Sequence, residues 1–214
     1  MIMAGKTLIV IVGPTGSGKT DLAVAVAEHF GSPVVSTDSR QIYRDLPIGT
    51  AHPDAEQLRR VRHYFIATHE LTEDFNCGAY EAAASELLDS LFVRYDTVVA
   101  VGGSGLYVKA LCEGMDDMPQ CDARLRERLA ERLREEGVDV LAEELRRLDP
   151  EFHAVVDRRN PARVLRALEV CISTGRPYSS FRTGRRRERP FGIVKIGTEA
   201  DRAELYARID RRVD

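Results

Sequence analysis

The sequence is poor in cysteine and has no long apolar run, and both absences exclude whole classes of protein. Four cysteines occur in 214 residues, at positions 77, 112, 121 and 171, and none forms a CxxC pair. This excludes a zinc ribbon and a disulfide scaffold, and favours free thiols in a reducing compartment. No run of eighteen apolar residues occurs, which argues against a membrane span. We therefore expect a cytoplasmic protein with no membrane partner, acting as a monomer.

Repeats with a period of 20 to 50 residues and low-complexity tracts are absent as well. With 43% apolar and 30% charged residues, a chain of this length can bury a real core. The net charge is only −3, but the basic residues are unevenly distributed. Residues 1–121 hold 9 Lys and Arg against 16 Asp and Glu, whereas residues 158–189 hold 10 Arg against two Glu. Such a basic region suits a polyanionic partner, although the arginines could instead only solvate helix faces and loops.

The pattern of apolar residues predicts alternating strands and helices. Residues 7–12 form a continuous apolar strand, followed by a glycine-rich turn over 13–18 and a helix that Gly31 and Pro33 terminate. Residues 34–37 give a second strand, and this strand–helix–strand succession implies a parallel sheet. A helix over 78–95 and an apolar strand over 97–101 continue the alternation.

The chain changes character after residue 115. Residues 122–148 show charge-rich helical periodicity broken at Gly137, and residues 161–174 form another helix. A strand over 191–196 then returns to the sheet. Thr198 is followed three residues later by the acidic Asp201, which is the spacing of a helix N-cap and its acidic partner, so a further helix is expected from there. We expect a core formed by residues 1–115 and 190–214, and a helical, arginine-rich insertion over 116–189.

The segment from Gly13 to Thr20 carries the most specific motif. Its sequence, GPTGSGKT, fits G-x-x-x-x-G-K-[ST], follows a predicted strand and opens a predicted helix. In such a loop consecutive backbone N–H groups point inward, and the helix N-terminus adds partial positive charge. Lys19 is expected to contact phosphate oxygens, and Thr20 to offer its hydroxyl to a bridging Mg²⁺. The predicted cradle for a phosphate, diphosphate or nucleotide comprises Gly13, Pro14, Thr15, Gly16, Ser17, Gly18, Lys19 and Thr20.

Together, the alternating strands and helices and this loop predict the fold class. We expect an α/β protein with a P-loop NTPase-like, three-layer parallel sheet core and a helical insertion.

Two further segments follow predicted strands and so lie at the same edge of the sheet as the loop. Asp38 can serve there as a base. Alternatively, it can cap a helix, or it can support a metal site indirectly, by holding a metal ligand in place. Residues 102–107 form a second glycine-rich lip, which tight strand-to-helix packing would also explain. The irregular spacing of His52, His63 and His69 argues against a metal site, and we assign these histidines no role.

In this order, the segments resemble the tRNA dimethylallyltransferases, also called tRNA isopentenyltransferases. The resemblance rests on GPTxxGKT at 13–20, DSRQIY at 38–43, IGTA at 48–51, VGGSGLY at 101–107, LDP at 148–150 and RxxRALEV at 163–170. It covers essentially the whole chain, but the family's proteins continue further, so we expect a C-terminally truncated chain. The chain departs from the family pattern in having one histidine where a pair is common (62–64), Arg-Asn-Pro at 159–161, and Ser104 in place of the commoner threonine.

The resemblance implies a transferase that moves a dimethylallyl group from dimethylallyl diphosphate to N6 of adenine 37, in tRNAs that read codons beginning with U. By the same resemblance, Lys19, Thr20 and Mg²⁺ neutralise the diphosphate leaving group, and Asp38 is the base. The flipped adenine would be held by Asp38, Ser39, Arg40 and Gln41, with Ser104 beside its channel. The remaining contacts to the anticodon stem-loop of the tRNA would come from Arg126, Ala162, Arg163, Val164, Leu165 and Arg166.

Three other functions remain open at this point. A small-molecule kinase would use the same loop for ATP, with Asp38 deprotonating an acceptor hydroxyl. A prenyltransferase that acts on free adenine nucleotides would share the diphosphate site but have little use for an arginine-rich insertion. A non-enzymatic nucleic-acid-binding module would leave the phosphate loop and Asp38 without a purpose.

Overall fold

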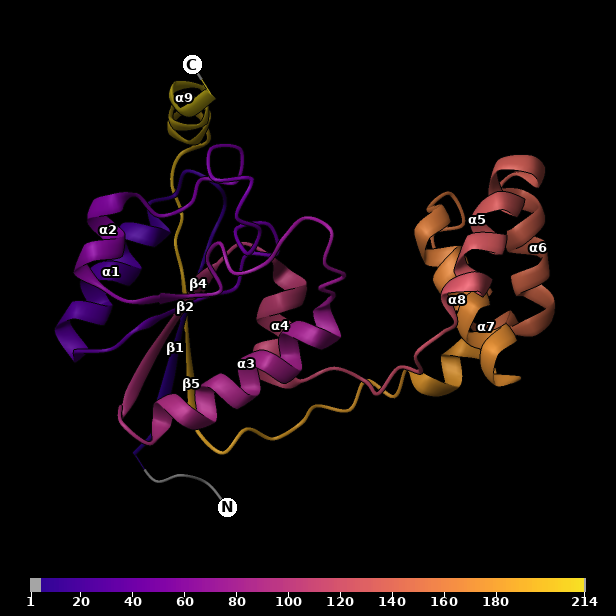
Figure 1. Ribbon diagram of the computed structural model, residues 1–214, viewed down its shortest axis with the longest axis horizontal. Helices are drawn as coiled ribbons and strands as arrows, with labels where there is room; N and C mark the ends of the chain where they lie inside the picture. The colour runs from indigo at the N-terminus through magenta and orange to yellow at the C-terminus, as the bar shows by residue number, and fades with distance from the viewer. Residues whose placement is uncertain (1–4, 214) are drawn as a thin grey trace. The chain divides into compact units, whose positions relative to one another are not determined.

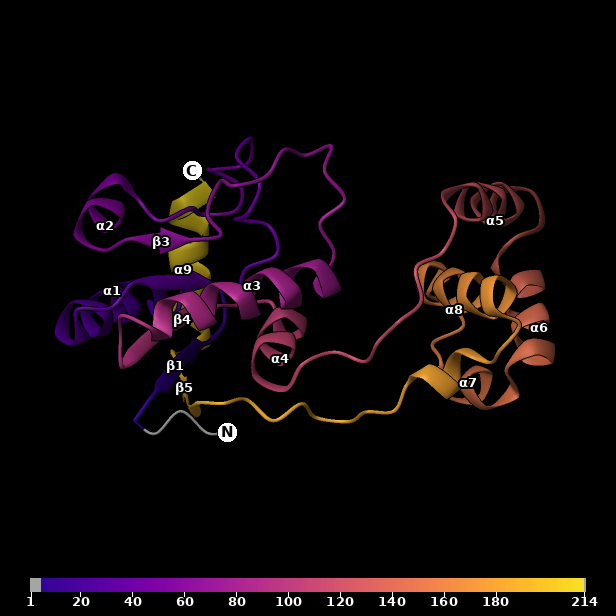
Figure 2. The ribbon, with the colours of Figure 1, turned by 60° about the horizontal axis from the view of Figure 1, so that its bottom comes forward.

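The computed structural model describes residues 5–213, which divide into two compact units. One unit comprises the described residues up to 115 together with those from 186 onward, and the other comprises residues 116–185. Two extended segments of chain join them (Figure 2). Residues 186–189, which the sequence analysis placed with the helical insertion, group with the first unit. The reason is that the guanidinium of Arg189 is held there by Glu81, at 2.9 Å, and by the carbonyl groups of Ala110 and Leu111.

The first unit is built on a five-stranded parallel sheet with the order β3-β2-β4-β1-β5. The strands are β1 (Thr7–Val12), β2 (Val34–Ser36), β3 (His63–Tyr64), β4 (Thr97–Gly102) and β5 (Gly192–Gly197). The four strands predicted from the sequence are confirmed to within a residue at either end. Strand β3 was not predicted, because two residues in a polar segment carry no periodicity that could be recognised.

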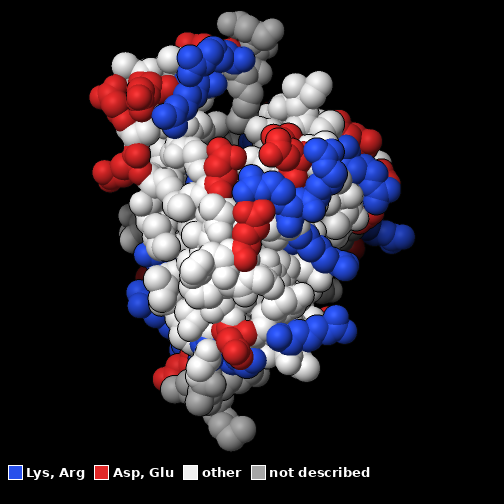
Figure 3. All heavy atoms as spheres, turned by 90° about the vertical axis from the view of Figure 1, so that its left-hand side faces the viewer, with Lys and Arg blue, Asp and Glu red and all other residues white. Residues whose placement is uncertain are grey.

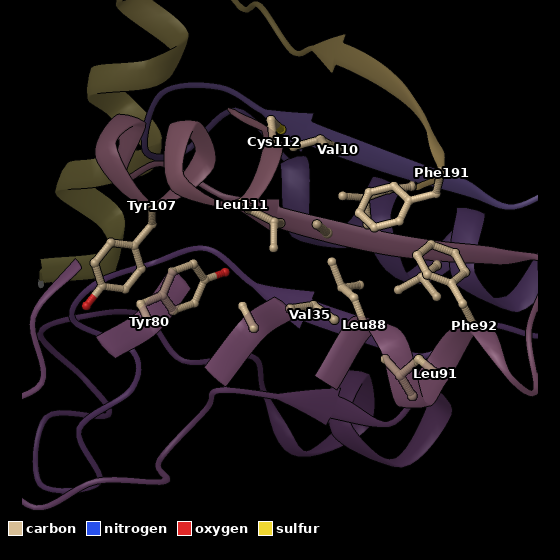
Figure 4. Close-up of a cluster of buried hydrophobic side chains, with 14 residues drawn as sticks. Val10, Val35, Tyr80, Leu88, Leu91, Phe92, Tyr107, Leu111, Cys112 and Phe191 are labelled. Carbon is tan, nitrogen blue, oxygen red and sulfur yellow. The ribbon is translucent and has the colours of Figure 1, made fainter. Parts of the chain in front are cut away.

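Helices cover both faces of this sheet, so the predicted three-layer α/β architecture is confirmed (Figure 1). Because successive side chains of a strand point to opposite faces, Leu8 and Val10 contact one helical layer and Ile9 and Ile11 the other. The first layer consists of α3 (Cys77–Phe92) and α4 (Gly105–Glu113), and the second is α1 (Lys19–Phe30). Figure 4 shows the larger cluster, in which Leu88 and Phe92 of α3 lie against the sheet and beside Phe191.

Two helices of the first unit lie outside this sandwich. The short helix α2 (Ala55–Arg60) follows a capping box in which Asp54 and Gln57 exchange side-chain and backbone hydrogen bonds. Helix α9 (Arg202–Val213) begins after Asp201, whose Oδ1 accepts from the backbone N–H of Ala203 at 2.8 Å. The prediction of an N-cap at Thr198 is wrong, because the hydroxyl of Thr198 contacts the phosphate loop instead, as described below.

The second unit is a small helical bundle with its own core. Helices α5 (Ala123–Glu136), α6 (Val138–Leu148), α7 (Pro150–Val155) and α8 (Pro161–Thr174) are followed by the 3₁₀ turn η1 (Tyr178–Phe181). Leu141, Leu145 and Leu168 are fully buried between the helices. The predicted break at Gly137 is confirmed, since this residue has φ of 85° and separates α5 from α6.

On the face formed by α1 and α2, basic and acidic side chains lie next to one another (Figure 3). Arg60 and Glu28 make one such pair, with both guanidinium–carboxylate contacts at 2.8 Å or less. This face therefore does not present a continuous surface of one charge. Within residues 5–213, no helix has the length and apolar character that crossing a bilayer requires.

Candidate active site

The carboxyl ends of the strands bring the sequence motifs to one edge of the sheet. The glycine-rich loop follows β1, Asp38 follows β2, Gly103 and Ser104 follow β4, and Thr198 follows β5. Since β1, β2, β4 and β5 are all parallel, their ends meet at this edge. The predicted juxtaposition of the loop and Asp38 is therefore a consequence of the sheet topology.

The phosphate loop has a conformation that requires glycine at two positions. Gly16 and Gly18 have φ of 81° and 79°, and Gly18 directly precedes α1 as its N-cap. Position 13 has no room for a side chain, because a Cβ there would lie 2.0 Å from Oγ1 of Thr198. The same threonine hydroxyl lies 2.7 Å from Oγ of Ser17. The end of β5 thus contacts both the first glycine and the centre of the loop.

A cavity of about 700 Å³ lies beside this loop. Its volume is within the range of ligand sites, and its walls come from the loop and the start of α1, from the segments after β2, from the end of β4, and from α2 and α9. It brings together part of the predicted cradle with Asp38, Arg40 and Gln41, whereas the predicted residues Gly13, Pro14, Ser17, Ser39 and Ser104 do not line it. The lining residues are Thr15, Gly16, Gly18, Lys19, Thr20, Asp21, Asp38, Arg40, Gln41, Gly49, Thr50, Ala51, His52, Pro53, Gln57, Val101, Gly102 and Arg208.

Asp38 combines a structural contact with an accessible carboxylate oxygen. Its Oδ1 accepts from the backbone N–H groups of Arg40, at 2.9 Å, and Gln41, at 3.3 Å. This pattern is an Asx-type turn, and it is neither of the two alternatives, a helix cap or a metal anchor, that the sequence analysis left open for this residue. Both bonds fall on Oδ1, so the second oxygen, Oδ2, retains its lone pairs for a proton. Asp38 can therefore fix its own loop and act as a base at the same time.

Hydrogen bonds stabilise the segments beside the cavity, and they are made by Ser39, Gln41 and Ser104. The hydroxyl of Ser104 accepts from the backbone N–H of Ser39 at 2.9 Å and lies 3.0 Å from the Ser39 hydroxyl. The amide of Gln41 donates to the carbonyl groups of Thr50, at 3.2 Å, and Ala51, at 2.6 Å. These bonds tie the segments after β2 and β4 together and fix the 48–52 turn, in which Ala51 has a positive φ of 50°.

Burial controls the ionisation of two side chains near Asp38. It lowers the pKa of His52 below its ordinary value of 6.5, and the negative charge of Asp38 only partly opposes the shift. His52 is therefore neutral at pH 7. Burial also raises the pKa of Tyr107 to about 12, assisted by nearby acidic groups that include Cys77 and Asp38. Tyr107 therefore remains a neutral hydrogen-bond donor.

Several cavity residues were missed by the sequence analysis, and Arg208 and His52 are two of them. Arg208 lies on α9 and donates to the carbonyl group of Gly16 at 3.1 Å, which places a guanidinium against the phosphate loop. His52 lines the same cavity, although no role was assigned to it. Neither belongs to a motif with a recognisable mechanism, and Arg208 reaches the loop only through the pairing of β5 with β1. For Arg208, the sequence offered no signal other than its place in the helix expected after Asp201.

The other residues predicted to bind tRNA belong to the second unit. Arg126 on α5 and Ala162 and Arg163 on α8 are exposed. Val164 is fully buried in the core of the helical unit, and Leu165 packs against this core. The side chains of both residues therefore contribute to the packing of the unit. Arg166 is half-buried and bonds to Glu169, Cys121 and the carbonyl group of Pro119. The exposed basic side chains of this group are thus Arg126 and Arg163.

A parallel α/β core with a glycine-rich loop after β1, and a carboxylate after β2, two strands away in the same sheet, define a protein of the P-loop-like α/β class. The family model described as IPP transferase matches residues 41–214. A protein named tRNA dimethylallyltransferase 1, from Bacteroides fragilis (strain YCH46), is 51% identical over 212 residues, which is 99% of this chain and 70% of that protein. The chain belongs to the IPP transferase family.

Other relatives agree with this assignment. The tRNA dimethylallyltransferase of Cytophaga hutchinsonii is 50% identical over all 214 residues, which again span 70% of its length. The crystal structure of the tRNA isopentenylpyrophosphate transferase from Bacillus halodurans is 35% identical, with a TM-score of 0.61 over 98% of this chain and 65% of that one. A eukaryotic dimethylallyltransferase acting on tRNA is 25% identical, with a TM-score of 0.82 over 98% of this chain and 52% of that one.

Proposed function

We propose that this protein transfers a dimethylallyl group from dimethylallyl diphosphate to N6 of adenine 37 in tRNAs that read codons beginning with U. The observation that carries the proposal is a cavity lined both by residues of the glycine-rich loop and by Asp38. The names of the relatives, tRNA dimethylallyltransferases, support the choice of both substrates. The free thiols favour a cytoplasmic location, and we propose that the protein acts as a monomer.

The cradle suits the diphosphate end of the donor. Backbone N–H groups at the start of α1, the ammonium of Lys19 and the guanidinium of Arg208 surround this part of the cavity. These donors stabilise negative charge that grows on the leaving group as the allylic C–O bond breaks. In the structure Lys19 donates to the carbonyl group of Pro14 at 3.0 Å, so its side chain is already directed back over the loop.

The oxygen donors at this end of the cavity also fit Mg²⁺. The Thr20 hydroxyl and the carboxylates of Asp21 and Asp38 all line it, and hard oxygen ligands are those that Mg²⁺ prefers. We propose that Thr20 is the ligand, because its position directly after the lysine is that of the metal-binding residue in such loops. When bound, the ion supplies further positive charge to the diphosphate oxygens.

Asp38 is suited to remove the proton that the acceptor must lose. A carboxylate is too weak a base to deprotonate neutral adenine N6. That proton becomes acidic only as the new bond from N6 to the allylic carbon forms. In the same step the electron pair of the C–O bond leaves with the diphosphate, and the N6 proton passes to Oδ2 of Asp38. Adenine has to leave its stack to reach this carboxylate, since N6 is inaccessible within a folded anticodon loop.

The helical unit supplies basic side chains for the RNA backbone. Arg126 and Arg163 are exposed on α5 and α8, and guanidinium groups bind phosphates with sequence-independent affinity. This use of the arginine-rich segment favours RNA over a free adenine nucleotide as the acceptor.

The test is a labelling experiment with competing acceptors. The protein is incubated with radiolabelled dimethylallyl diphosphate, Mg²⁺ and an anticodon stem-loop containing adenine 37, alone or with AMP. Label in the RNA, lost when adenine 37 is replaced by guanine, supports the proposal. Label that moves to AMP and not to RNA identifies a nucleotide prenyltransferase. ATP consumption that depends on a small hydroxyl acceptor identifies a kinase.

A further inference from the structure

The second unit contains a buried carboxylate that is paired with two arginines. Glu169 on α8 is only 4% exposed. One of its oxygens accepts from Nε of Arg126 on α5 at 3.0 Å, and the other accepts from Arg166 on α8 at 3.1 Å. Removing a carboxylate from water is costly unless each oxygen has a charged partner. Glu169 therefore constrains both guanidinium groups.

The two arginines differ in how far their side chains are exposed. The guanidinium of Arg166 also donates to the thiol of Cys121, at 3.3 Å, and to the carbonyl group of Pro119, at 3.1 Å. Its hydrogen bonds thus hold the segment that precedes α5. Arg126 has a side chain that is 55% exposed, compared with 35% for Arg166. The same carboxylate therefore fixes one arginine within the fold and one at the surface.

A contact through Nε sets the plane of the guanidinium. Because Nε and the two terminal nitrogens are coplanar, a carboxylate held rigidly at Nε fixes the direction of the whole group. A planar group binds a phosphate through two parallel hydrogen bonds only when that direction is right. Glu169 is itself rigid, since it is buried on a helix beside the core residue Leu168.

We propose that Glu169 is a positioning residue that orients Arg126 toward a phosphate of the anticodon stem-loop. The inference rests on the proposed function, because it concerns how the same RNA is bound. It assigns Glu169 no contact with RNA. The carboxylate orders an exposed arginine before RNA arrives, so that less side-chain freedom is lost on binding.

Glu169 could also affect the affinity for RNA through its negative charge, and this effect has the opposite sign to that of orienting Arg126. The proposal is therefore testable. A carboxylate near the RNA also repels phosphates, so its removal by Glu169→Gln adds net positive charge and by itself strengthens RNA binding. If orientation dominates, Glu169→Gln raises the KM for the stem-loop by about 2- to 10-fold, the range expected for freeing one ordered side chain. The kcat and the KM for dimethylallyl diphosphate stay within twofold, because both depend on the other unit.

The matched control is Glu136→Gln. Glu136 pairs with Arg132 on α5, and Arg132 keeps a second partner in Glu144, so this change removes one carboxylate of the same helical unit without isolating a charge. We expect the control to leave the KM for the stem-loop unchanged. A KM for Glu169→Gln that falls, or that matches the control, overturns the inference. Absence of label transfer by the unaltered protein would instead refute the proposed function.

A second variant covers the case in which Glu169→Gln does not fold. Arg126→Lys changes an exposed residue and removes the planar group, but it keeps a positive charge beside the buried carboxylate of Glu169. It is expected to raise the KM for the stem-loop by the same 2- to 10-fold factor. The double variant should then be no worse than either single variant, because both remove one oriented guanidinium. An unchanged KM in Arg126→Lys, or two effects that multiply in the double variant, would overturn the inference.

Discussion

Replacing Asp38 by asparagine separates its two roles, because the structural role belongs to one carboxylate oxygen. Oδ1 accepts from the backbone of Arg40 and Gln41, and the side-chain oxygen of an asparagine can accept the same two bonds. The loop therefore keeps its turn in Asp38→Asn. What is lost is the base. General-base catalysis contributes roughly 100- to 10,000-fold to a rate, which corresponds to about 3 to 5 kcal/mol of transition-state stabilisation.

Asp38→Ala is the informative comparison. It removes the base together with both hydrogen bonds, each of which contributes about 1 kcal/mol to the local structure. Both variants should lose catalysis to the same extent, but only Asp38→Ala should also loosen the 38–41 loop and weaken the binding of the stem-loop.

The assay is single-turnover transfer of the labelled dimethylallyl group to the stem-loop, with binding followed separately by fluorescence anisotropy of the RNA. We expect Asp38→Asn to lower the single-turnover rate by at least 100-fold and to change the Kd for RNA by less than threefold. A rate within tenfold of the unaltered protein would show that Asp38 is not the base.

Three further predictions concern the cradle, the helical core and pH. Lys19→Met removes a charge-assisted hydrogen bond worth about 1.5 to 3 kcal/mol, so calorimetric titration with inorganic diphosphate should show affinity lowered by roughly 10- to 100-fold, and unchanged affinity would contradict the assignment of the loop. Leu168→Ala removes a fully buried side chain, and urea unfolding should show a loss of about 2 to 5 kcal/mol; a loss under 1 kcal/mol would contradict the packing of the second unit. Burial lowers the pKa of His63 below 6.5, so the unfolded chain takes up a proton first as the pH falls. The contribution of His63 to stability should therefore be full above pH 6.5 and decline from there down to the folded-state pKa, so the difference in Tm between pH 7.5 and 5.5 should be smaller in His63→Gln than in the unaltered protein.

The parts of the fold that depend on local pattern were predictable from the sequence. Continuous apolar segments gave four of the five strands, and the glycine-rich loop between strand and helix gave the position of the cradle. Helix α7 was missed although its signal is present, since Asp149 followed by Pro150 is a typical helix start and Asp149 does cap the backbone N–H of Phe152 at 2.9 Å.

The parts of the site that depend on long-range pairing were not predictable in this way. Thr198 contacts Ser17, and Arg208 contacts Gly16, only because β5 lies beside β1 in the sheet. The spacing of Thr198 and Asp201 instead favoured a helix cap, which a single threonine hydroxyl cannot provide while it contacts the loop. Similarly, no sequence pattern links Glu169 to Arg126, whose contact exists because two helices pack together.

The position of β1 between β4 and β5 has a consequence for biosynthesis. This strand is translated before its hydrogen-bonding partners, which are encoded about 90 and 185 residues later. Until β5 has been translated and has added to the sheet, Thr198 is missing from its place against Gly13, and the loop lacks one of its walls. The glycine-rich loop is translated before β4 and β5 but reaches its final shape only after them, so a nascent chain stalled before β5 should not bind diphosphate even though its entire glycine-rich loop has already emerged.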